Sequence, residues 1–257
     1  MTRNLNLKRY AFTAILALLL GAALSSAPQA NEVPDPAQIV AKADRIRFPQ
    51  EGFQVDISIT TTTPDSEPDV REYRVLSKGN ENTVILTTAP AADRGQIMLM
   101  RGRDFWAFMP SVSQPIRLPL SQKLTGQVAN GDLARANFAG DYNPKITRTE
   151  EIEGRKYYVL ELTAVDRGVT YPRVLYWVDK ENHKPYKAEF YTLSNRLFKT
   201  CRFQKFESME GEVRPTQLVM ENALKKDERS ILDYKKMKLK DLPDKVFTKD
   251  YLKKLQE

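Results

Sequence analysis

The sequence predicts a mainly β protein in which one long antiparallel sheet of about eleven strands curls up. Two observations lead to this fold class. Almost every stretch after residue 50 alternates apolar with polar residues and ends at a turn signal. Residues 95–110, in contrast, are apolar at nearly every strand position. Because a twisted sheet of this many strands rarely stays flat, we expect the meander to curl.

The first 30 residues predict a cleaved export signal, followed by a single domain over residues 31–257. Arg3, Lys8 and Arg9 precede an apolar run at residues 11–24, and small residues follow at 25–30. That run of about 14 residues is shorter than the roughly 20 that a membrane-spanning helix needs. No cysteine stands directly after it, so we expect a protein without a lipid anchor, located in the periplasm.

A short amphipathic helix is expected next, at residues 36–45. Asp35 is a suitable N-cap, and Pro36 suits the first helical position. Strand patterns begin with residues 53–60, in which Phe53, Val55 and Ile57 share one face. They continue at residues 71–77 and 83–88, around the turn at 78–80.

Residues 95–110 predict a β-hairpin around the turn at 101–104. Successive side chains of a strand point to opposite faces, and here both faces are apolar. The pattern separates Ile97 and Leu99 from Met98 and Met100, and Phe105, Ala107 and Met109 from Trp106 and Phe108. Each face of this hairpin must therefore be covered by a helix, a second layer, a partner or a lipid.

Residues 120–138 interrupt the strand pattern, and we interpret them as an inserted covering flap with a short helix after Asp132. Four polar residues in and after this segment could form a latch between flap and sheet rim: Asp132, Arg135, Asp141 and Tyr142. The alternative is helix capping with a local surface ion pair. Strand patterns then resume at 145–152 and continue to 230–239, and Thr248 could cap a last short helix.

The composition argues against several classes of function. The chain has one cysteine, Cys201, and one histidine, His183, far apart in sequence, which makes a zinc site or a Cys/His nucleophile unexpected. Nucleophile-elbow, phosphate-loop and dinucleotide signatures are missing, so we expect neither an enzyme nor a cofactor. Beyond residue 30 the chain has 37 basic and 33 acidic residues and no basic–aromatic stripe, which argues against nucleic acid.

An ordered set of short motifs resembles the LolA-like outer-membrane lipoprotein-sorting family over essentially the whole chain after the signal. The set comprises residues 43–45 with Pro49, 73–79, 98–100 with Trp106 and 109–110, 115–118, Gly126, 131–135, 141–142, 171–172, 176–178, 242–244 and 247–248. The resemblance implies an unclosed β-barrel of eleven strands, whose concave apolar face is covered by short helices. It does not assign the lid-holding basic residue, for which Arg45, Arg47 and Arg117 are candidates.

The resemblance also implies a monomeric carrier for lipid or for the acyl chains of lipoproteins, moving between an inner-membrane transporter and an outer-membrane acceptor. The expected cavity lining is Phe53, Val55, Ile57, Met98, Met100, Trp106 and Phe108. Methionine suits such a site because its flexible side chain adapts to different ligands. The alternative function is an accessory protein that docks on a membrane lipid transporter and carries no cargo.

Overall fold

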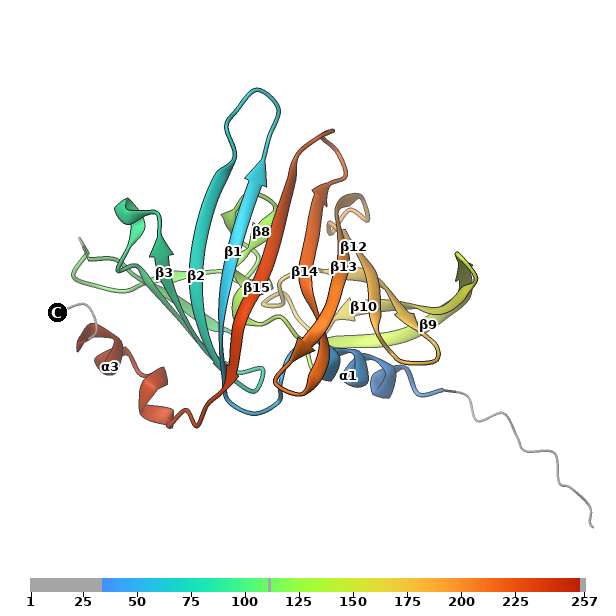
Figure 1. Cartoon of the computed structure of the whole chain (residues 1–257), viewed down its shortest axis with the longest axis horizontal. Coiled ribbons are helices and arrows are strands. Elements are labelled where there is room, and N and C mark those ends of the chain that lie inside the picture. Colours follow the sequence, from blue (N-terminus) through green and yellow to red (C-terminus); the bar gives the residue numbers. More distant parts are fainter. Residues whose placement is uncertain (1–33, 111, 255–257) are drawn as a thin grey trace, which may run out of the picture. The chain divides into compact units, whose positions relative to one another are not determined.

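Figure 1 shows the computed structural model, which describes residues 34–110 and 112–254; the expected signal peptide lies outside these residues. Within them, thirteen strands form one antiparallel sheet that does not close. From edge to edge the order is β6 (Ile116–Leu118), β5 (Asp104–Phe108), β4 (Ile97–Arg101), β3 (Asn82–Ala89), β2 (Asp69–Lys78), β1 (Phe53–Thr62), β15 (Arg229–Leu239), β14 (Glu212–Asn222), β13 (Leu197–Met209), β12 (Pro185–Tyr191), β11 (Arg173–Asp179), β10 (Arg155–Ala164) and β9 (Tyr142–Ile152).

This order follows from short turns, because each strand pairs with its neighbour in sequence except at one place. The chain runs outward from β1 to the edge strand β6, crosses to the other edge at β9, and returns to pair β15 with β1. We call residues 119–141, which make the crossing, the crossover segment. The mainly β, unclosed fold is confirmed, with more strands than the eleven expected.

Helices cover both faces of the sheet. Helix α1 (Pro36–Arg47) begins as expected, with the Asp35 carboxylate accepting from the Ala37 N–H at 2.9 Å. The crossover segment contains the hairpin β7 (Lys123–Thr125) and β8 (Val128–Ala129) and then helix α2 (Asn130–Ala134). After β15 come the 3₁₀ turn η2 (Asp244–Phe247) and helix α3 (Lys249–Lys254); another 3₁₀ turn, η1 (Ala91–Asp93), follows β3. No helix of the described residues has the length and apolarity to cross a membrane.

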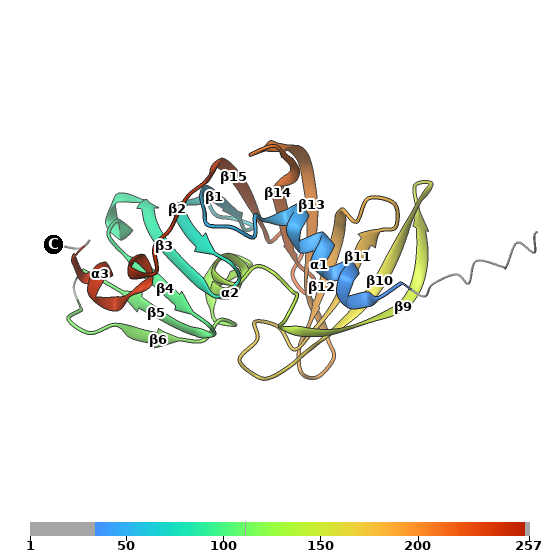
Figure 2. The same cartoon turned by 90° about the horizontal axis from the view of Figure 1, so that it is seen from below.

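The sheet curves around α1 and α2, as Figure 2 shows, and we call the face toward them the inner face. Side chains of β1 alternate between buried and half-buried, as the sequence pattern predicted. The buried ones join Ile39, Val40 and Ala43 of α1 in the main core. On the opposite, outer face of β3, β4 and β5, a second apolar cluster packs under η2 and α3. Both faces of the doubly apolar hairpin are therefore covered by the chain itself.

Candidate functional site

The inner face holds five of the seven residues expected to line a cavity. Phe53, Val55 and Ile57 of β1 belong to the main core, together with Met98 and Met100 of β4. Strand pairing places Met98 opposite Ala107 and Met100 opposite Phe105. On β2 and β3 the hydroxyls of Ser77 and Thr83, which bond each other, interrupt this mainly apolar face. A broad apolar surface of this kind fits the body of an acyl chain.

Trp106 and Phe108 lie on the outer face, which corrects the expectation that they line the same cavity. Trp106 pairs with Leu99, and Phe108 pairs with Ile97. These four side chains pack in one apolar cluster with Leu242, Val246, Phe247 and Leu252 of the C-terminal segment. The Lys249 ammonium also lies 4.1 Å from the centre of the Trp106 ring. The C-terminal segment, rather than a ligand, covers this face of the hairpin.

The crossover segment lies against the inner side of the sheet through two glycines. At Gly126, in the β7–β8 turn, a Cβ would come within 2.2 Å of both Thr61 Oγ1 and Ser230 Oγ. The next residue, Gln127, donates its N–H to Ser230 Oγ at 3.0 Å. At Gly131, in α2, a Cβ would lie 1.9 Å from Thr170 Oγ1. Only glycine permits such close approach, so the covering segment is fitted tightly to β1, β15 and the β10–β11 connection.

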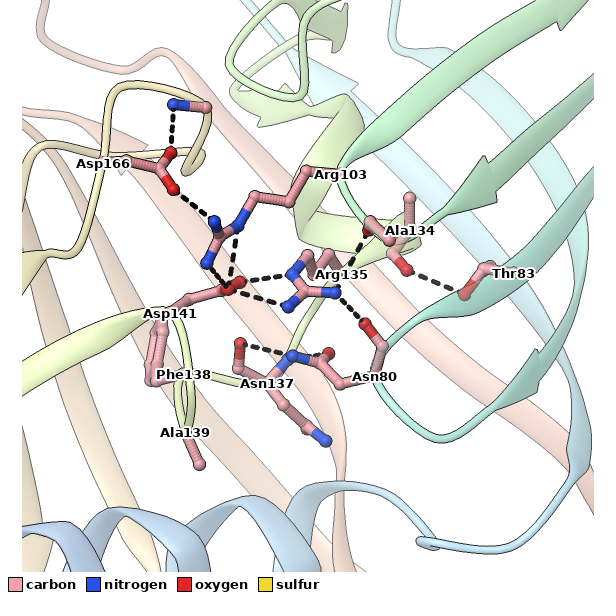
Figure 3. Close-up of polar contacts among 12 residues, drawn as sticks. Asn80, Thr83, Arg103, Ala134, Arg135, Asn137, Phe138, Ala139, Asp141 and Asp166 are labelled. Carbon is pink, nitrogen blue, oxygen red and sulfur yellow. Dashed lines mark hydrogen bonds and ion pairs between the residues drawn. The ribbon is translucent and has the colours of Figure 1, made fainter.

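Arg135 and Asp141 form the centre of a buried polar latch (Figure 3). Arg135 Nε and Nη2 donate to the two carboxylate oxygens of Asp141 at 2.5 and 2.8 Å. Arg135 Nη1 also donates to the carbonyls of Asn80 and Gly102, which belong to the β2–β3 and β4–β5 turns. Arg103 donates from its Nη2 to Asp141 Oδ1 at 2.9 Å and pairs with the more exposed Asp166. These contacts fasten the crossover segment to two turns of the sheet.

Asp132 belongs to a separate cluster. Its carboxylate accepts from Lys199 Nζ at 2.9 Å, from the Tyr171 hydroxyl at 2.7 Å and from the Ala129 N–H at 2.8 Å. Lys199 is only 2% exposed and also donates to the Gln127 carbonyl at 2.9 Å. Burial, reinforced by the Asp132 charge, raises the pKa of Tyr171 well above its ordinary value, so its hydroxyl keeps its proton. This cluster ties α2 to β13.

Tyr142, the fourth residue of the expected latch, packs in the apolar core instead. Its ring meets Phe138 edge-on, with 5.5 Å between the ring centres. Burial raises the pKa of the Tyr142 hydroxyl. Of the four residues, the structure therefore joins Arg135 to Asp141, places Asp132 with Lys199 and leaves Tyr142 outside both clusters.

Asp44 connects α1 to the end of the crossover segment. Its Oδ2 accepts the N–H groups of Phe138 and Ala139 at 2.9 and 2.7 Å, and its Oδ1 lies 3.4 Å from Arg47 Nη1. Burial raises the pKa of this carboxyl to about 6, against the opposing effect of Arg47 and the two N–H donors. Helix and crossover segment thus share one buried carboxyl group.

Comparison with known proteins establishes the family. A family model described as "uncharacterized protein" matches residues 79–254. The crystal structure of a LolA superfamily protein from Nitrosomonas europaea is 60% identical, covers 85% of this chain and 100% of its own, and has a TM-score of 0.83. This chain belongs to the LolA superfamily.

Two more distant structures share the fold of this LolA superfamily member. One comes from Vibrio parahaemolyticus and is described as an outer membrane lipoprotein-sorting protein domain. It is 19% identical, covers 85% of this chain and 98% of its own, and has a TM-score of 0.73. The other is a DUF1329 family protein from Desulfovibrio piger, with 20% identity, coverage of 85% and 100%, and a TM-score of 0.72. None of the curated proteins matches the sequence.

The space between the inner face of this LolA superfamily chain and its cover differs from place to place. The largest cavity there, of about 300 Å³, lies between the β7–β8 hairpin and β13 and is lined by Gln127, Phe198 and Lys199 among others. Beneath α2 and beside α1 the space is much smaller. A cavity of about 20 Å³ lies between β1, β2 and α2, lined by Phe53, Val55 and Ile57 among others. A second of about 20 Å³ lies beside Arg47, Phe138 and Phe203. Each has room for about one water molecule. An acyl chain can therefore reach Phe53, Val55 and Ile57 of the inner face only after the covering segments move.

Two charged residues important to this closed form, Asp44 and Lys199, were missed as site residues, although the sequence carries a signal for each. Arg47 was named only as one of three candidates for the basic residue that holds the lid. Asp44 and Arg47 lie on the same helical stripe as Val40 and Ala43. Lys199 has the same strand parity as Cys201 and Phe203, which places it inward. A charge at a position that the pattern assigns to the core indicates a buried partner.

The buried Asp44 carboxyl gives a pH-dependent prediction for Asp44→Asn. The pKa of Asp44 is about 6 in the folded protein against 3.8 for the ordinary carboxyl, so the folded state holds this proton more tightly. Protonation of Asp44 therefore stabilises the fold below pH 4, and this stabilisation is lost as the pH rises through 6. Between pH 4.5 and 7 the wild type should lose about 2 kcal/mol of unfolding free energy relative to Asp44→Asn. Urea unfolding of both proteins at the two pH values measures this; an unchanged difference between them would contradict it.

Proposed function

We propose that this chain is a periplasmic carrier that binds lipid or lipoprotein acyl chains on its inner face and has no catalytic step. The observation that carries the proposal is the broad, mainly apolar inner face, covered by a crossover segment that is not part of the main sheet. Burying one methylene group stabilises a complex by roughly 0.8 kcal/mol, so ten to twelve of them supply about 8–10 kcal/mol before ordering costs. That is enough for micromolar binding if the cover opens at little cost.

The crossover segment lies outside the main sheet and buries apolar side chains such as Leu120, Leu133 and Phe138 in the core, so opening exposes a surface that an acyl chain can cover. The Arg135–Asp141 latch, the Asp132–Lys199 cluster and the Asp44 contacts involve few residues each. Transfer between membranes requires a ligand to enter and leave, and a partner at either membrane could provide the differential contacts that favour the open form. An inner-membrane transporter and an outer-membrane acceptor are the partners that we propose.

The small cavities favour an alternative function, an accessory protein of a membrane lipid transporter that carries no cargo. In this case the interior remains packed, and the outer surface of the protein binds the transporter. The two functions differ in whether an acyl chain reaches the inner face.

Photolabelling distinguishes these functions. The protein is incubated with vesicles of a phospholipid that bears a diazirine in its acyl chain, irradiated and digested for peptide mass spectrometry. The carrier function predicts saturable labels on inner-face strands, with Phe53, Val55, Ile57, Met98 and Met100 as the expected positions. Labels confined to the outer face near Trp106 would contradict it. So would labelling that an excess of unlabelled lipid does not reduce.

Gly126→Ala is expected to weaken the closed form. The added Cβ would overlap Thr61 Oγ1 and Ser230 Oγ, so the β7–β8 turn would be displaced at a cost of about 1–3 kcal/mol. Because opening precedes binding, the apparent Kd for an acyl probe should fall by up to about tenfold per 1.4 kcal/mol. Fluorescence titration measures this change.

Gly154→Ala is the matched control for this variant. Gly154 also has a positive φ, +76° against +50° at Gly126, but a Cβ there would meet no atom within 4 Å. It therefore carries the backbone strain without the overlap. Equal probe affinity in the two variants would show that seating of the β7–β8 turn does not control access.

A further inference from the structure

Arg47 is a buried cation with few hydrogen-bond partners. Its side chain is 6% exposed, and its guanidinium lies 4.9 Å from the ring centre of Phe138 and 5.2 Å from that of Phe203. Among the described residues its one hydrogen bond goes to Asp44, at a long 3.4 Å. A guanidinium has five N–H donors, and charged groups are rarely left in an interior with so few acceptors. Arg47 therefore has unused capacity to bind an anion.

A second unused donor lies beside it. Tyr176 of β11 is fully buried beside the Arg47 guanidinium, and its O–H donates to no acceptor among the residues that the structure describes. Burial raises the pKa of this hydroxyl, and the neighbouring Arg47 charge opposes that rise. The hydroxyl therefore stays protonated and can donate. An unpartnered buried hydroxyl costs roughly 1–3 kcal/mol, which a ligand acceptor would recover.

Apolar side chains surround these two donors on one side, and the charged groups of Asp132, Arg135 and Asp141 line the cavity beside Arg47 on the side of the crossover segment. The small cavity at Arg47 is also lined by Phe138, Phe203, Leu218 and Met220. The titratable groups that influence Arg47 are Asp44, Tyr176, Tyr234 and Cys201, and Asp44 alone is a carboxyl. When the crossover segment moves, Asp44 loses the N–H donors of Phe138 and Ala139. The donors of Arg47 and Tyr176 would then face an apolar surface able to hold a chain.

We propose that Arg47 and Tyr176 together bind the anionic group of the cargo, a carboxylate or a phosphate attached to an acyl chain. This inference rests on the proposed function and defines its ligand class as acidic amphiphiles. Arg47 supplies charge and paired N–H donors, and the Tyr176 hydroxyl supplies a third donor. The three aromatic rings around Arg47, those of Phe48, Phe138 and Phe203, hold the guanidinium in place by cation–π contact.

The test compares ligands with the same chain and different head groups. Binding of palmitate, hexadecyl phosphate and uncharged hexadecanol is measured by displacement of a fluorescent acyl probe. Wild type should bind at least one of the two anions about 10- to 100-fold more tightly than hexadecanol, as expected for hydrogen bonds to a charged group in a buried site. Which anion is preferred distinguishes a carboxylate from a phosphate cargo.

Two variants and a control locate the preference. Arg47→Met should reduce it to less than about threefold while hexadecanol still binds, and Tyr176→Phe should reduce it in part. Arg45→Met is the control, because Arg45 lies on the same helix but is exposed. Should Arg47→Met fail to fold, Tyr176→Phe decides, since it removes only an unpartnered hydroxyl.

The outcomes separate this inference from the proposed function. Equal binding of all three ligands by wild type would overturn the inference and leave the carrier function standing. The same holds if the preference for an anion is unchanged in both Arg47→Met and Tyr176→Phe. Binding of none of the three ligands and no displacement of the probe would overturn both.

Discussion

Asp141→Asn is expected to lower the free energy of unfolding by about 3–5 kcal/mol. Asp141 is the carboxylate partner of Arg135, and both side chains are almost completely buried. The amide would leave the Arg135 guanidinium buried without a counter-charge, which is the costly way to break such a pair. Urea unfolding followed by tryptophan fluorescence measures the change.

Asp166→Asn is the control for the latch. Asp166 also pairs with Arg103, but its side chain is 48% exposed. Exposed ion pairs contribute little, so we expect a change within about 0.5 kcal/mol. Similar losses in the two variants would contradict the assignment of Asp141 as the central residue of the latch.

Asp132→Asn is the second change with a large expected effect, again about 3–5 kcal/mol. It leaves Lys199 buried without its carboxylate and weakens the hydrogen bonds to Tyr171 and Ala129. Urea unfolding of the single variant gives its cost.

A double-mutant cycle tests whether Asp132 acts through Lys199. In Asp132→Asn/Lys199→Met the unpaired charge is gone, so the double variant should be more stable than the sum of the two single changes predicts. Strict additivity would mean that the two residues contribute independently, against the contacts described above.

The sequence was sufficient to predict the sheet because its strands are joined by short turns and carry a period of two. Helix α1 was equally clear from its cap and apolar stripe. Strands β7 and β8 were missed because two or three residues are too few to show a period. Their pairing depends on where the β7–β8 turn fits against Thr61 and Ser230, which are distant in sequence.

The face of the β4–β5 hairpin could not be predicted from alternation alone. The pattern separates Met98 from Leu99 and Trp106 from Ala107, but it does not say which set faces inward. That choice depends on the C-terminal segment around Phe247, which follows the hairpin by more than a hundred residues and covers the outer face. Strand pairing would have excluded placing Met98 and Trp106 together, because Met98 lies opposite Ala107.

The latch was predictable in part. Arg135 and Asp141, two of the four residues grouped from the sequence, lie six residues apart and pair in the structure. The contribution of Arg103 and of the Asn80 and Gly102 carbonyls depends on two turns that only the folded sheet brings together. Asp132 was grouped with the latch because of its proximity in sequence, yet its partner Lys199 lies on β13.

The most direct test of the carrier function is mass spectrometry of organic extracts from protein purified out of the periplasm of a Gram-negative host. Two variants on opposite faces of the same hairpin accompany the wild type: Met98→Glu on the inner face and Trp106→Glu on the outer face. We predict a stoichiometric acyl ligand in the wild type and in folded Trp106→Glu, and its loss in folded Met98→Glu. A clean extract from folded wild type, repeated after incubation with membranes, would contradict the carrier function and favour the transporter-accessory alternative.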